Sequence, residues 1–495
     1  MLPRGHSNGA PYEPRSPRAS VLRRLLLEHL ETLVGQARQA DETGAGLPAY
    51  VERALRAVIG CGDPASGFLR VRCSRCGGER IVPFSCRSRT VCPSCGARRM
   101  EAMVAHLTER VLPDEPLRQW TVSFPFALRR LLAADAELLS AVHRSFVRLV
   151  FLTLRSKAEV PRGRAGAVSL IQRFDSSLGL DPHVHLCALD GVYARREDGT
   201  LEFFDTGAPT ASEVETVALR LHRAIGGILR RRGLLTREGD LAPRESQETT
   251  PLERLYEAAA RDFIASGTLD ARGEPRVRPR APLATQRLGP LLVDVDGINV
   301  HADLRIEKGD RQGRERLFRY GLRPPFADEQ IQLTGDGRIA FALRKARKNG
   351  DTHRFFTPLQ FLRRLAWLCA PPRQALVRYE GVLAPAAPWR SSVVPAPAST
   401  NGDPVLVSLP DGEPPRDGRS PAGAARRWAA LLRRVYDVDA LLCPKSGCGG
   451  RMRVVGAITS PAVIRRILEH LGLPAELPTF SPARGPPPSA FSGFD

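Results

Sequence analysis

The sequence predicts an α+β protein that is divided into more than one domain. Helical periodicity runs over 20–39 and 97–157, and strand-like runs follow at 166–174 and 183–193. Cysteines crowd the segment 61–95, between the two helical regions. A chain of 495 residues is long enough to bury two or more cores. We therefore expect a helical, cysteine-rich region ahead of a larger α+β domain.

The expected domain boundaries follow changes in composition. Pro, Ala and Gly become dense after Pro371, which is typical of a linker, and both ends of the chain are polar and Pro-rich. The expected parts are a disordered tail at 1–19, a helical and cysteine-rich domain at 20–105, the large α+β domain at 106–370, a Pro/Ala-rich linker at 371–426, a small cysteine-containing module at 427–473 and a second disordered tail at 474–495.

The charge balance predicts a polyanionic partner. Lysine and arginine number 73 against 53 aspartates and glutamates, so the formal net charge is +20, which favours nucleic acid. No run of about 18 apolar residues is present, and the N-terminus lacks the apolar core of a signal peptide. We expect no membrane span and an intracellular, cytoplasmic location. In that setting, ten cysteines predict metal ligands or free thiols rather than disulfides.

Two cysteine pairs are spaced like the knuckles of a structural zinc site. Cys73 and Cys76 form the first pair, and Cys92 and Cys95 form the second pair 15 residues later. Each pair presents two thiolates on one tight turn, and together they would complete a tetrahedral Zn²⁺ site. A closed all-thiolate site leaves no open position for a substrate, so this zinc is expected to stabilise the fold.

The remaining cysteines of interest have no clear partners in the sequence. Cys61 and Cys86 lie near the two pairs; either can replace a ligand, although a free buried thiol is the simpler interpretation. Cys443 and Cys448 form a single, wider pair, which needs a further ligand such as His470 to bind zinc. A knuckle and a free-thiol turn are equally compatible with this pair.

Arginines flank the second knuckle, where Arg98 and Arg99 follow Cys95. Basic side chains around a zinc-binding module are suited to contact DNA phosphates. The alternative is a solvated basic surface.

The segment DPHVHLCALDG at 181–191 places two histidines around a valine in a run of strand-forming residues. In a strand, residues i and i+2 share a face, so His183 and His185 point to one side while Val184 points to the other. Two imidazoles on one face of a strand suit a divalent metal. The competing interpretation is a hydrogen-bonded histidine beside an incidental one.

A tyrosine stands among arginines in RERLFRYGLRPPF at 314–326. Tyr320 lies between Arg319 and Arg323 at the end of a predicted helix. A tyrosine becomes a useful nucleophile toward phosphorus when a cation neutralises the phosphate oxygens. An aromatic side chain packed on the core, with arginines facing solvent, is the alternative.

Taken in order, these motifs resemble the rolling-circle transposases of bacterial insertion sequences. The resemblance covers about 20–390 and includes the knuckles, RFDSSLGLDPHVHLCALDGVY at 173–193, GINVHADLRI at 297–306 and the tyrosine segment. Those transposases belong to the HUH superfamily, named for its His-hydrophobic-His motif. The resemblance implies an N-terminal transposase zinc-binding domain and an HUH-type nuclease domain with a central antiparallel sheet flanked by helices.

The resemblance also implies roles for single residues. His183 and His185 would hold a catalytic Mg²⁺ or Mn²⁺, and Tyr320 would attack a single-stranded or hairpin transposon end, leaving a 5′-phosphotyrosine. Arg98, Arg99, Arg319 and Arg323 would contact DNA. The superfamily usually supplies a third polar metal ligand; Gln172 is the first candidate, equally readable as a surface glutamine, and His301 is the second.

The sequence departs from the two-tyrosine members of this family. They place a second tyrosine four residues earlier on the same helix face, where this chain has Arg316, so it resembles a single-tyrosine variant. Tyr379 lies in another family-like segment, but its spacing does not make it catalytic. A non-catalytic zinc-ribbon DNA-binding protein, a decayed transposase and a metal-independent tyrosine recombinase are the alternative functions, and the oligomeric state is undetermined.

Overall fold

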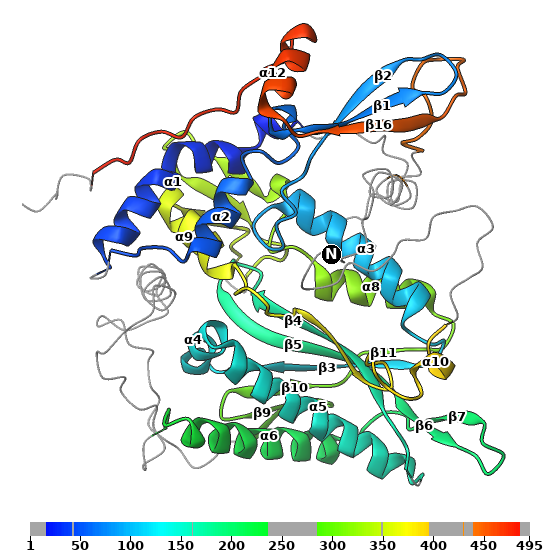
Figure 1. Cartoon of the computed structure of the whole chain (residues 1–495). Helices are drawn as coiled ribbons and strands as arrows, with labels where there is room; N and C mark the ends of the chain where they lie inside the picture. The colour runs from blue at the N-terminus through cyan, green and yellow to red at the C-terminus, as the bar shows by residue number, and fades with distance from the viewer. Residues whose placement is uncertain are drawn as a thin grey trace, which may run out of the picture.

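The computed structural model of the chain describes residues 16–41, 44–160, 162–235, 285–347, 350–395, 429 and 439–485. An antiparallel sheet lies at its centre, with strand order β15-β4-β5-β3-β10-β9-β8 and β11 paired to β3 (Figure 1). The strands are β3 (Leu117–Ser123), β4 (Gly166–Phe174), β5 (Leu180–Leu189), β8 (Thr285–Gly289), β9 (Leu292–Val295), β10 (Ile298–His301), β11 (Arg305–Ile306) and β15 (Val377–Gly381). The α+β class and the antiparallel sheet between helices are confirmed.

Helices cover both faces of this sheet because apolar side chains point alternately to one face and to the other along its strands. Ile171 and Val184 point to one face, where they pack against three helices. Leu170 and Cys187 point to the other face, where they pack against two. The first layer contains α4 (Phe126–Ala134), α5 (Ala136–Ala158) and α6 (Ala211–Arg231), and the second contains α3 (Pro93–Arg110) and α8 (Arg311–Leu322).

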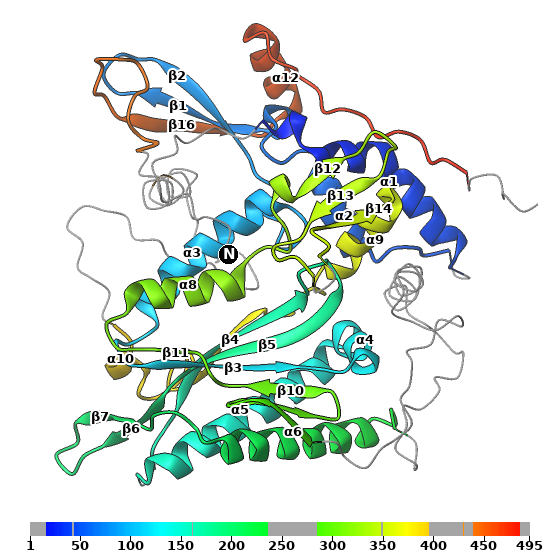
Figure 2. The same cartoon turned by 180° about the vertical axis from the view of Figure 1, so that it is seen from behind.

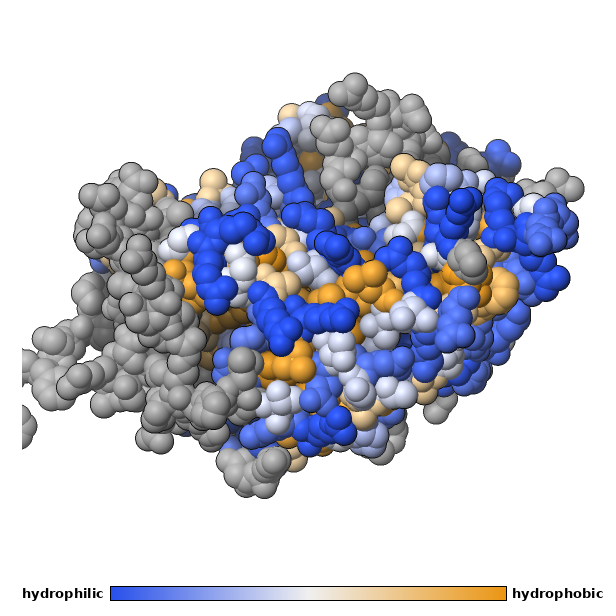
Figure 3. Space-filling model, turned by 90° about the horizontal axis from the view of Figure 1, so that it is seen from below, coloured by the Kyte–Doolittle hydropathy of each residue, from blue (hydrophilic) through white to orange (hydrophobic). Residues whose placement is uncertain are grey.

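The outer face of the first layer is seen from below in Figure 3. Hydrophilic side chains cover most of what is visible, with apolar side chains scattered among them. No helix in the described part of the chain is both long enough and apolar enough to cross a membrane.

The N-terminal helices share a core with a segment that lies more than 300 residues later. Leu26 and Leu30 of α1 belong to the same cluster as Phe361 and Leu365 of α9. A small sheet of three strands completes this region behind α1 (Figure 2). Its elements are α1 (Val21–Gln39), α2 (Ala49–Ala57), α9 (Pro358–Leu368), β12 (Ile331–Leu333), β13 (Ile339–Ala342) and β14 (His353–Phe356). The expected boundary at 105 therefore does not separate two independent cores.

A second three-stranded sheet joins the two ends of the chain. β1 (Phe68–Cys73) pairs with β2 (Glu79–Pro83) on one side and with β16 (Met452–Ile458) on the other (Figure 1). α12 (Pro461–His470) follows β16, and Ile464 and Leu468 pack on Phe68. The expected module at 427–473 is thus docked on the N-terminal hairpin rather than separate.

Two further expectations about the C-terminal third need correction. The expected linker at 371–426 contains β15, which pairs with β4 in the main sheet, and α10 (Arg390–Val393). The described part of the expected tail at 474–495 runs beside α1, where the Ser481 N–H donates to the Leu27 carbonyl at 2.8 Å. Residues 1–15 of the expected tail at 1–19, residues 396–426 of the expected linker and residues 427–428 and 430–438 of the expected module lie outside the described residues. The remaining strands, β6 (Gly191–Arg195) and β7 (Leu201–Asp205), form a hairpin.

A buried ion pair connects the adjacent ends of three strands of the main sheet, β3, β5 and β10. Arg118 of β3 and Asp190, just after β5, are 2% and 0% exposed, and their closest atoms are 2.8 Å apart. Arg118 also donates to the Ala302 carbonyl, just after β10, at 3.0 Å. Both buried charges therefore have a partner. Since Arg118 contacts residues at the ends of two other strands, it also holds the three strands in one alignment.

Removing one member of this pair should destabilise the fold strongly. Asp190→Ala leaves the Arg118 guanidinium buried without a counter-charge, so we expect the free energy of unfolding to fall by about 3–5 kcal/mol. Urea denaturation of the purified protein measures this. The control is Glu202→Ala, which breaks an exposed pair with Arg196 and should change stability far less. Equal losses in the two variants would contradict the structural role.

Candidate active site and cysteine clusters

His183 and His185 lie on the same face of β5, as strand geometry requires. Their ring centroids are 4.8 Å apart. Val184 between them is fully buried on the opposite face, among the apolar side chains that pack against α4–α6. The valine thereby holds the strand in the core and fixes the direction of both imidazoles.

Each histidine uses Nδ1 in a contact with the protein, which leaves Nε2 for a ligand. His183 Nδ1 donates to the Asp181 carbonyl at 2.7 Å. His185 Nδ1 lies 2.5 Å from the Gln119 amide nitrogen and 3.2 Å from the Thr121 hydroxyl, and in the tautomer whose Nδ1–H donates to this hydroxyl the Nε2 lone pair is free for a ligand. His185 Nε2 is buried without a hydrogen-bond partner among the described residues. Contacts of this kind orient imidazoles that bind metals.

Burial favours the neutral form of both rings. It lowers the pKa of His183, and it lowers that of His185 well below the ordinary value, with a further contribution from the neighbouring His183. Neutral imidazoles can donate a lone pair at physiological pH, so these two side chains are ready to act as ligands.

Gln172 of β4 lies directly opposite His183 in the antiparallel pairing of β4 with β5. Its side chain is 3% exposed, and its Nε2 donates to the Tyr320 and Gly321 carbonyls at 2.9 and 2.7 Å. Its Oε1 is buried and has no hydrogen-bond partner among the described residues. An unpartnered buried oxygen is costly, and here it lies in the strand position next to His183.

Tyr320 stands in the last turn of α8, beside the histidines. Its ring centroid is 5.6 Å from that of His185, and 42% of the residue is exposed. The helix comes this close to the sheet because the next residue is glycine. A Cβ at Gly321 would lie 2.3 Å from Leu170 of β4. Gln172 then anchors the end of the helix through its two hydrogen bonds.

Two arginines flank the tyrosine, and one of them was not found from the sequence. The Arg323 guanidinium carbon lies 4.5 Å from the Tyr320 ring centroid. Arg344, in the segment after β13, is close enough to Arg323 and Tyr320 to interact with both electrostatically. Burial, and then the charge of Arg323, lower the pKa of Arg344 to about 10. Arg344 lies 24 residues after Tyr320, and no sequence pattern links the two.

The other arginines expected to contact DNA have different surroundings. Arg319 pairs with Glu101 of α3 at 2.9 Å and with Glu315 at 3.2 Å, so it joins α8 to α3 instead of presenting a free charge. Arg98 donates to the Ser85 hydroxyl at 3.0 Å. Arg99 lines a pocket between α3 and the sheet edge.

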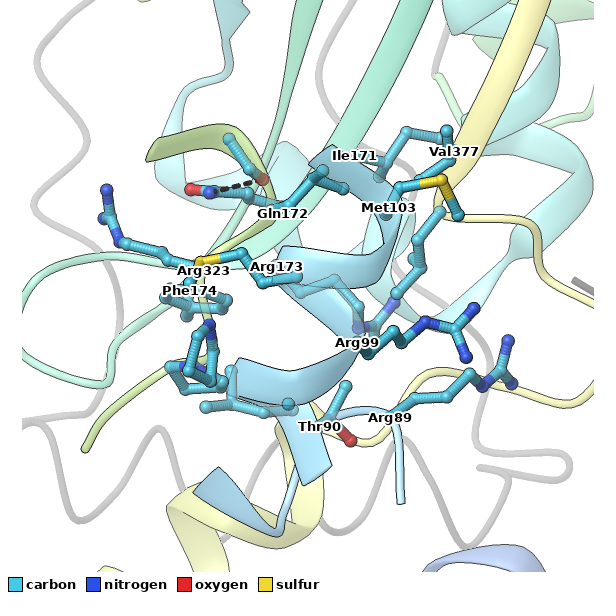
Figure 4. Close-up of a pocket in the computed structure, with 18 residues that line it drawn as sticks. Arg89, Thr90, Arg99, Met103, Ile171, Gln172, Arg173, Phe174, Arg323 and Val377 are labelled. Carbon is cyan, nitrogen blue, oxygen red and sulfur yellow. Dashed lines mark hydrogen bonds between the residues drawn. The ribbon is translucent and has the colours of Figure 1, made fainter. Parts of the chain in front are cut away.

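That pocket connects the cysteine-rich region to the candidate active site. Gln172 and Arg323 lie at one side of it, and Arg89 and Arg99 lie at the other (Figure 4). Apolar side chains, including Met103, form part of the lining between them.

The other sequence candidates lie further from the histidine pair. His301 of β10 pairs with Thr121 of β3, so β3 separates its strand from β5. Tyr379 lies on β15, with its hydroxyl 3.9 Å from the Met103 sulfur. Arg316, at the position of the second tyrosine, is exposed on α8.

The cysteines form two clusters, and this corrects the expected zinc site. The pair Cys92 and Cys95 meets Cys61 and Cys86, whereas the pair Cys73 and Cys76 lies in a separate cluster. One zinc therefore cannot bind the four residues Cys73, Cys76, Cys92 and Cys95 together. The hairpin β1–β2 carries the first knuckle away from the start of α3, which holds the second.

The first cluster, formed by Cys61, Cys86, Cys92 and Cys95, has the dimensions of a thiolate zinc site. Three of its Sγ–Sγ distances are 3.5–3.6 Å. A tetrahedron with Zn–S bonds of about 2.3 Å has edges of about 3.8 Å, while a disulfide measures about 2.05 Å. The Ser88 N–H also points at Cys86 Sγ, at 3.5 Å.

The second cluster brings Cys73 and Cys76 together with Cys443 and Cys448. The Cys73–Cys448 and Cys76–Cys443 sulfur distances are both 3.7 Å. His470, the ligand expected to complete the C-terminal pair, is on α12 and is not part of the cluster.

Comparisons with known proteins agree with these features. A family model described as "Transposase zinc-binding domain" matches residues 33–124, and one described as "Putative transposase" matches residues 166–390. No curated protein and no solved structure matches the chain. The first match contains the whole first cysteine cluster, and the second contains the histidine pair and Tyr320. The chain therefore belongs to the transposase family that carries this zinc-binding domain, the IS91 type of rolling-circle transposase.

Proposed function

We propose that this transposase nicks and rejoins single-stranded DNA at transposon ends, with Tyr320 as the nucleophile. The observation that carries the proposal is that two buried polar atoms without hydrogen-bond partners lie beside an exposed tyrosine. His185 Nε2 and Gln172 Oε1 are buried without partners among the described residues, and Tyr320 contacts the His185 ring. A purely structural packing of these side chains would satisfy those atoms.

The donor set fits a divalent cation. An amide oxygen suits Mg²⁺ or Mn²⁺, and imidazole nitrogens favour Mn²⁺, a transition metal, over Mg²⁺; none of these donors is charged. His183, His185 and Gln172 would hold the ion. When bound, it would act as a Lewis acid that withdraws charge from the phosphate oxygens.

The chain's own residues account for positioning and charge. Gln172 holds the helix end that carries Tyr320, and Arg323 and Arg344 place positive charge where the phosphate would lie. The Tyr320 oxygen forms a bond to phosphorus while the bond to the 3′ oxygen breaks, and the tyrosine proton goes to solvent as the leaving oxygen gains one. The products are a 5′-phosphotyrosine and a 3′-hydroxyl. Strand transfer reverses the exchange without ATP.

A single nucleophile limits the reaction to one covalent strand at a time. Arg316 occupies the place of a second tyrosine, so this chain would act by a one-tyrosine route. We place this reaction at the nucleoid in the bacterial cytoplasm and expect single strands or hairpin ends as substrates, because HUH nucleases act on unpaired strands.

Tyr320→Phe should separate DNA binding from chemistry. It keeps the ring but removes the oxygen that attacks, so we expect normal binding and no covalent adduct. Labelled single-stranded oligonucleotides with Mn²⁺, followed by a denaturing gel, measure the adduct. Tyr379→Phe is the matched control and should still form it. An adduct in Tyr320→Phe would show that the nucleophile is misassigned. A wild-type protein that binds DNA but forms no adduct would support a non-catalytic DNA-binding protein or a decayed transposase.

The proposed metal ligands can be tested without DNA cleavage. We expect His185→Ala to weaken Mn²⁺ binding by about tenfold or more, since a ligand atom is lost. Gln172→Leu should weaken it as well. Electron paramagnetic resonance of free Mn²⁺ during titration measures the affinity. His301→Ala serves as the control and should have no effect. A large loss in His301→Ala with none in Gln172→Leu would move the third ligand to His301.

We also propose that the first cluster holds a structural zinc. Cys61→Ser should lower the zinc content of the full chain by one ion, although Cys61 stands apart from both sequence pairs. Metal analysis of the purified protein measures this, and Cys369→Ala, a buried thiol in the same core, should retain all zinc. Unchanged zinc in Cys61→Ser would contradict the cluster.

A further inference from the structure

We propose that Cys73, Cys76, Cys443 and Cys448 form a second zinc site, which clamps the C-terminal module onto the N-terminal hairpin. The transposase zinc-binding domain matched at 33–124 includes only half of these ligands. The other half lies in a segment outside both family matches. None of these cysteines is a residue of the proposed cleavage site, so the inference does not rest on the proposed DNA cleavage.

The sulfur positions fit a metal and not a disulfide. All four Sγ atoms lie within 4.8 Å of one another, and the two printed contacts between the halves are both 3.7 Å. This is close to the edge of about 3.8 Å in a tetrahedral zinc–thiolate site. It is far longer than an S–S bond of about 2.05 Å. Each half of the site contributes two thiolates, which gives a closed structural geometry.

The surrounding backbone is shaped to hold thiolates. The Arg75 N–H lies 3.4 Å from Cys73 Sγ, an interaction that stabilises a negative sulfur. On the other half, Gly450 passes directly over the cluster. A Cβ there would lie 2.6 Å from Cys73 Sγ and 3.3 Å from Cys448 Sγ. Glycine at this position is therefore required by the close approach of the two halves.

The site lies where two remote segments pair. Cys73 ends β1 and is opposite Met452, the first residue of β16. The Arg75 side chain also donates to the Cys448 carbonyl at 2.6 Å. The hydrophobic cluster beside the sulfurs contains few buried side chains: Val71, Cys73, Cys443, Cys448 and Met452.

Among the described residues, the other buried cluster between the module and the hairpin contains only Phe68, Ile464 and Leu468, and small modules with so few buried side chains usually depend on a metal. We infer that zinc binding couples the two ends of the chain. The ligands of the two halves are separated by 367 and 375 residues, so loss of the ion would free β16 and α12 from β1. The metal enters as Zn²⁺, and the thiol protons leave to solvent.

The first experiment counts metal ions in the full-length protein. We expect two zinc ions per wild-type chain and one in the double variant Cys443→Ser/Cys448→Ser. The double variant Cys187→Ala/Cys369→Ala removes the same number of thiols outside the clusters and should keep two. Titration of the apoprotein with Co²⁺ should show tetrahedral thiolate absorption that saturates at two equivalents in the wild type and at one in Cys443→Ser/Cys448→Ser. The same number of zinc ions in that variant as in the wild type would overturn the proposal, whereas a wild type with one zinc that the variant loses would contradict the first cluster instead.

A second pair of variants covers the case in which the double variant fails to fold. Gly450→Ala pushes a methyl group against Cys73 Sγ, so chelator should remove one of its two zinc ions at least about tenfold faster than from the wild type. Gly456→Ala, in the middle of β16, has nothing within 4 Å of its Cβ and should behave like the wild type. Equal zinc release from both variants would refute the clamp.

Hydrogen exchange shows whether the metal holds the module. Amides of β16 should exchange faster in Cys443→Ser/Cys448→Ser than in the wild type, while those of β4 and β5 should be unchanged. If β16 stays equally protected, the strand is held without the metal and the coupling is wrong.

Discussion

The antiparallel pairing of β4 with β5 is the constraint on which the candidate active site depends. It places Gln172 opposite His183 and Leu170 opposite His185. Since side chains alternate across a strand, the same pairing that buries Val184 and Ile171 against α4–α6 turns both histidines toward α8. A slip of one residue in this register would exchange the two faces and bury the imidazoles in an apolar core. The buried Arg118–Asp190 pair protects the alignment at the far end of β5.

The position of Tyr320 follows from that register through a short series of contacts. Gly321 packs directly against the Leu170 side chain, and Gln172 donates hydrogen bonds to the carbonyls of Tyr320 and Gly321. Under the proposed function Gln172 would have two roles, because its amide nitrogen binds the helix end that carries the proposed nucleophile while its unpartnered oxygen is the proposed metal ligand. Arg319 adds a link from α8 to Glu101 of α3. The helix that carries the proposed nucleophile is thus linked to α3, which begins at the second cysteine pair.

The cysteine clusters show how the structure uses the two knuckles differently. The knuckle at Cys92 and Cys95 opens α3 and is completed by residues from within the same region. The knuckle at Cys73 and Cys76 sits at the tip of a hairpin and is completed from the other end of the chain. This arrangement connects α3, and through it α8, to one cluster and the C-terminal module to the other. It explains why the small module does not form a separate domain.

The sequence by itself determined the features that depend on local periodicity and spacing. It predicted the α+β class, the shared face of His183 and His185, the helix that carries Tyr320 and the cysteine pairs, because each of these follows from a few consecutive residues. Only the tertiary structure decided which cysteines meet, since a CxxC pair specifies two ligands and does not indicate where in the chain the other two lie. The same holds for Arg344 beside Tyr320, for Arg319 in an ion pair, and for β15 inside the expected linker. Contacts between residues far apart in the chain depend on how strands pair and helices pack, and no local pattern records them.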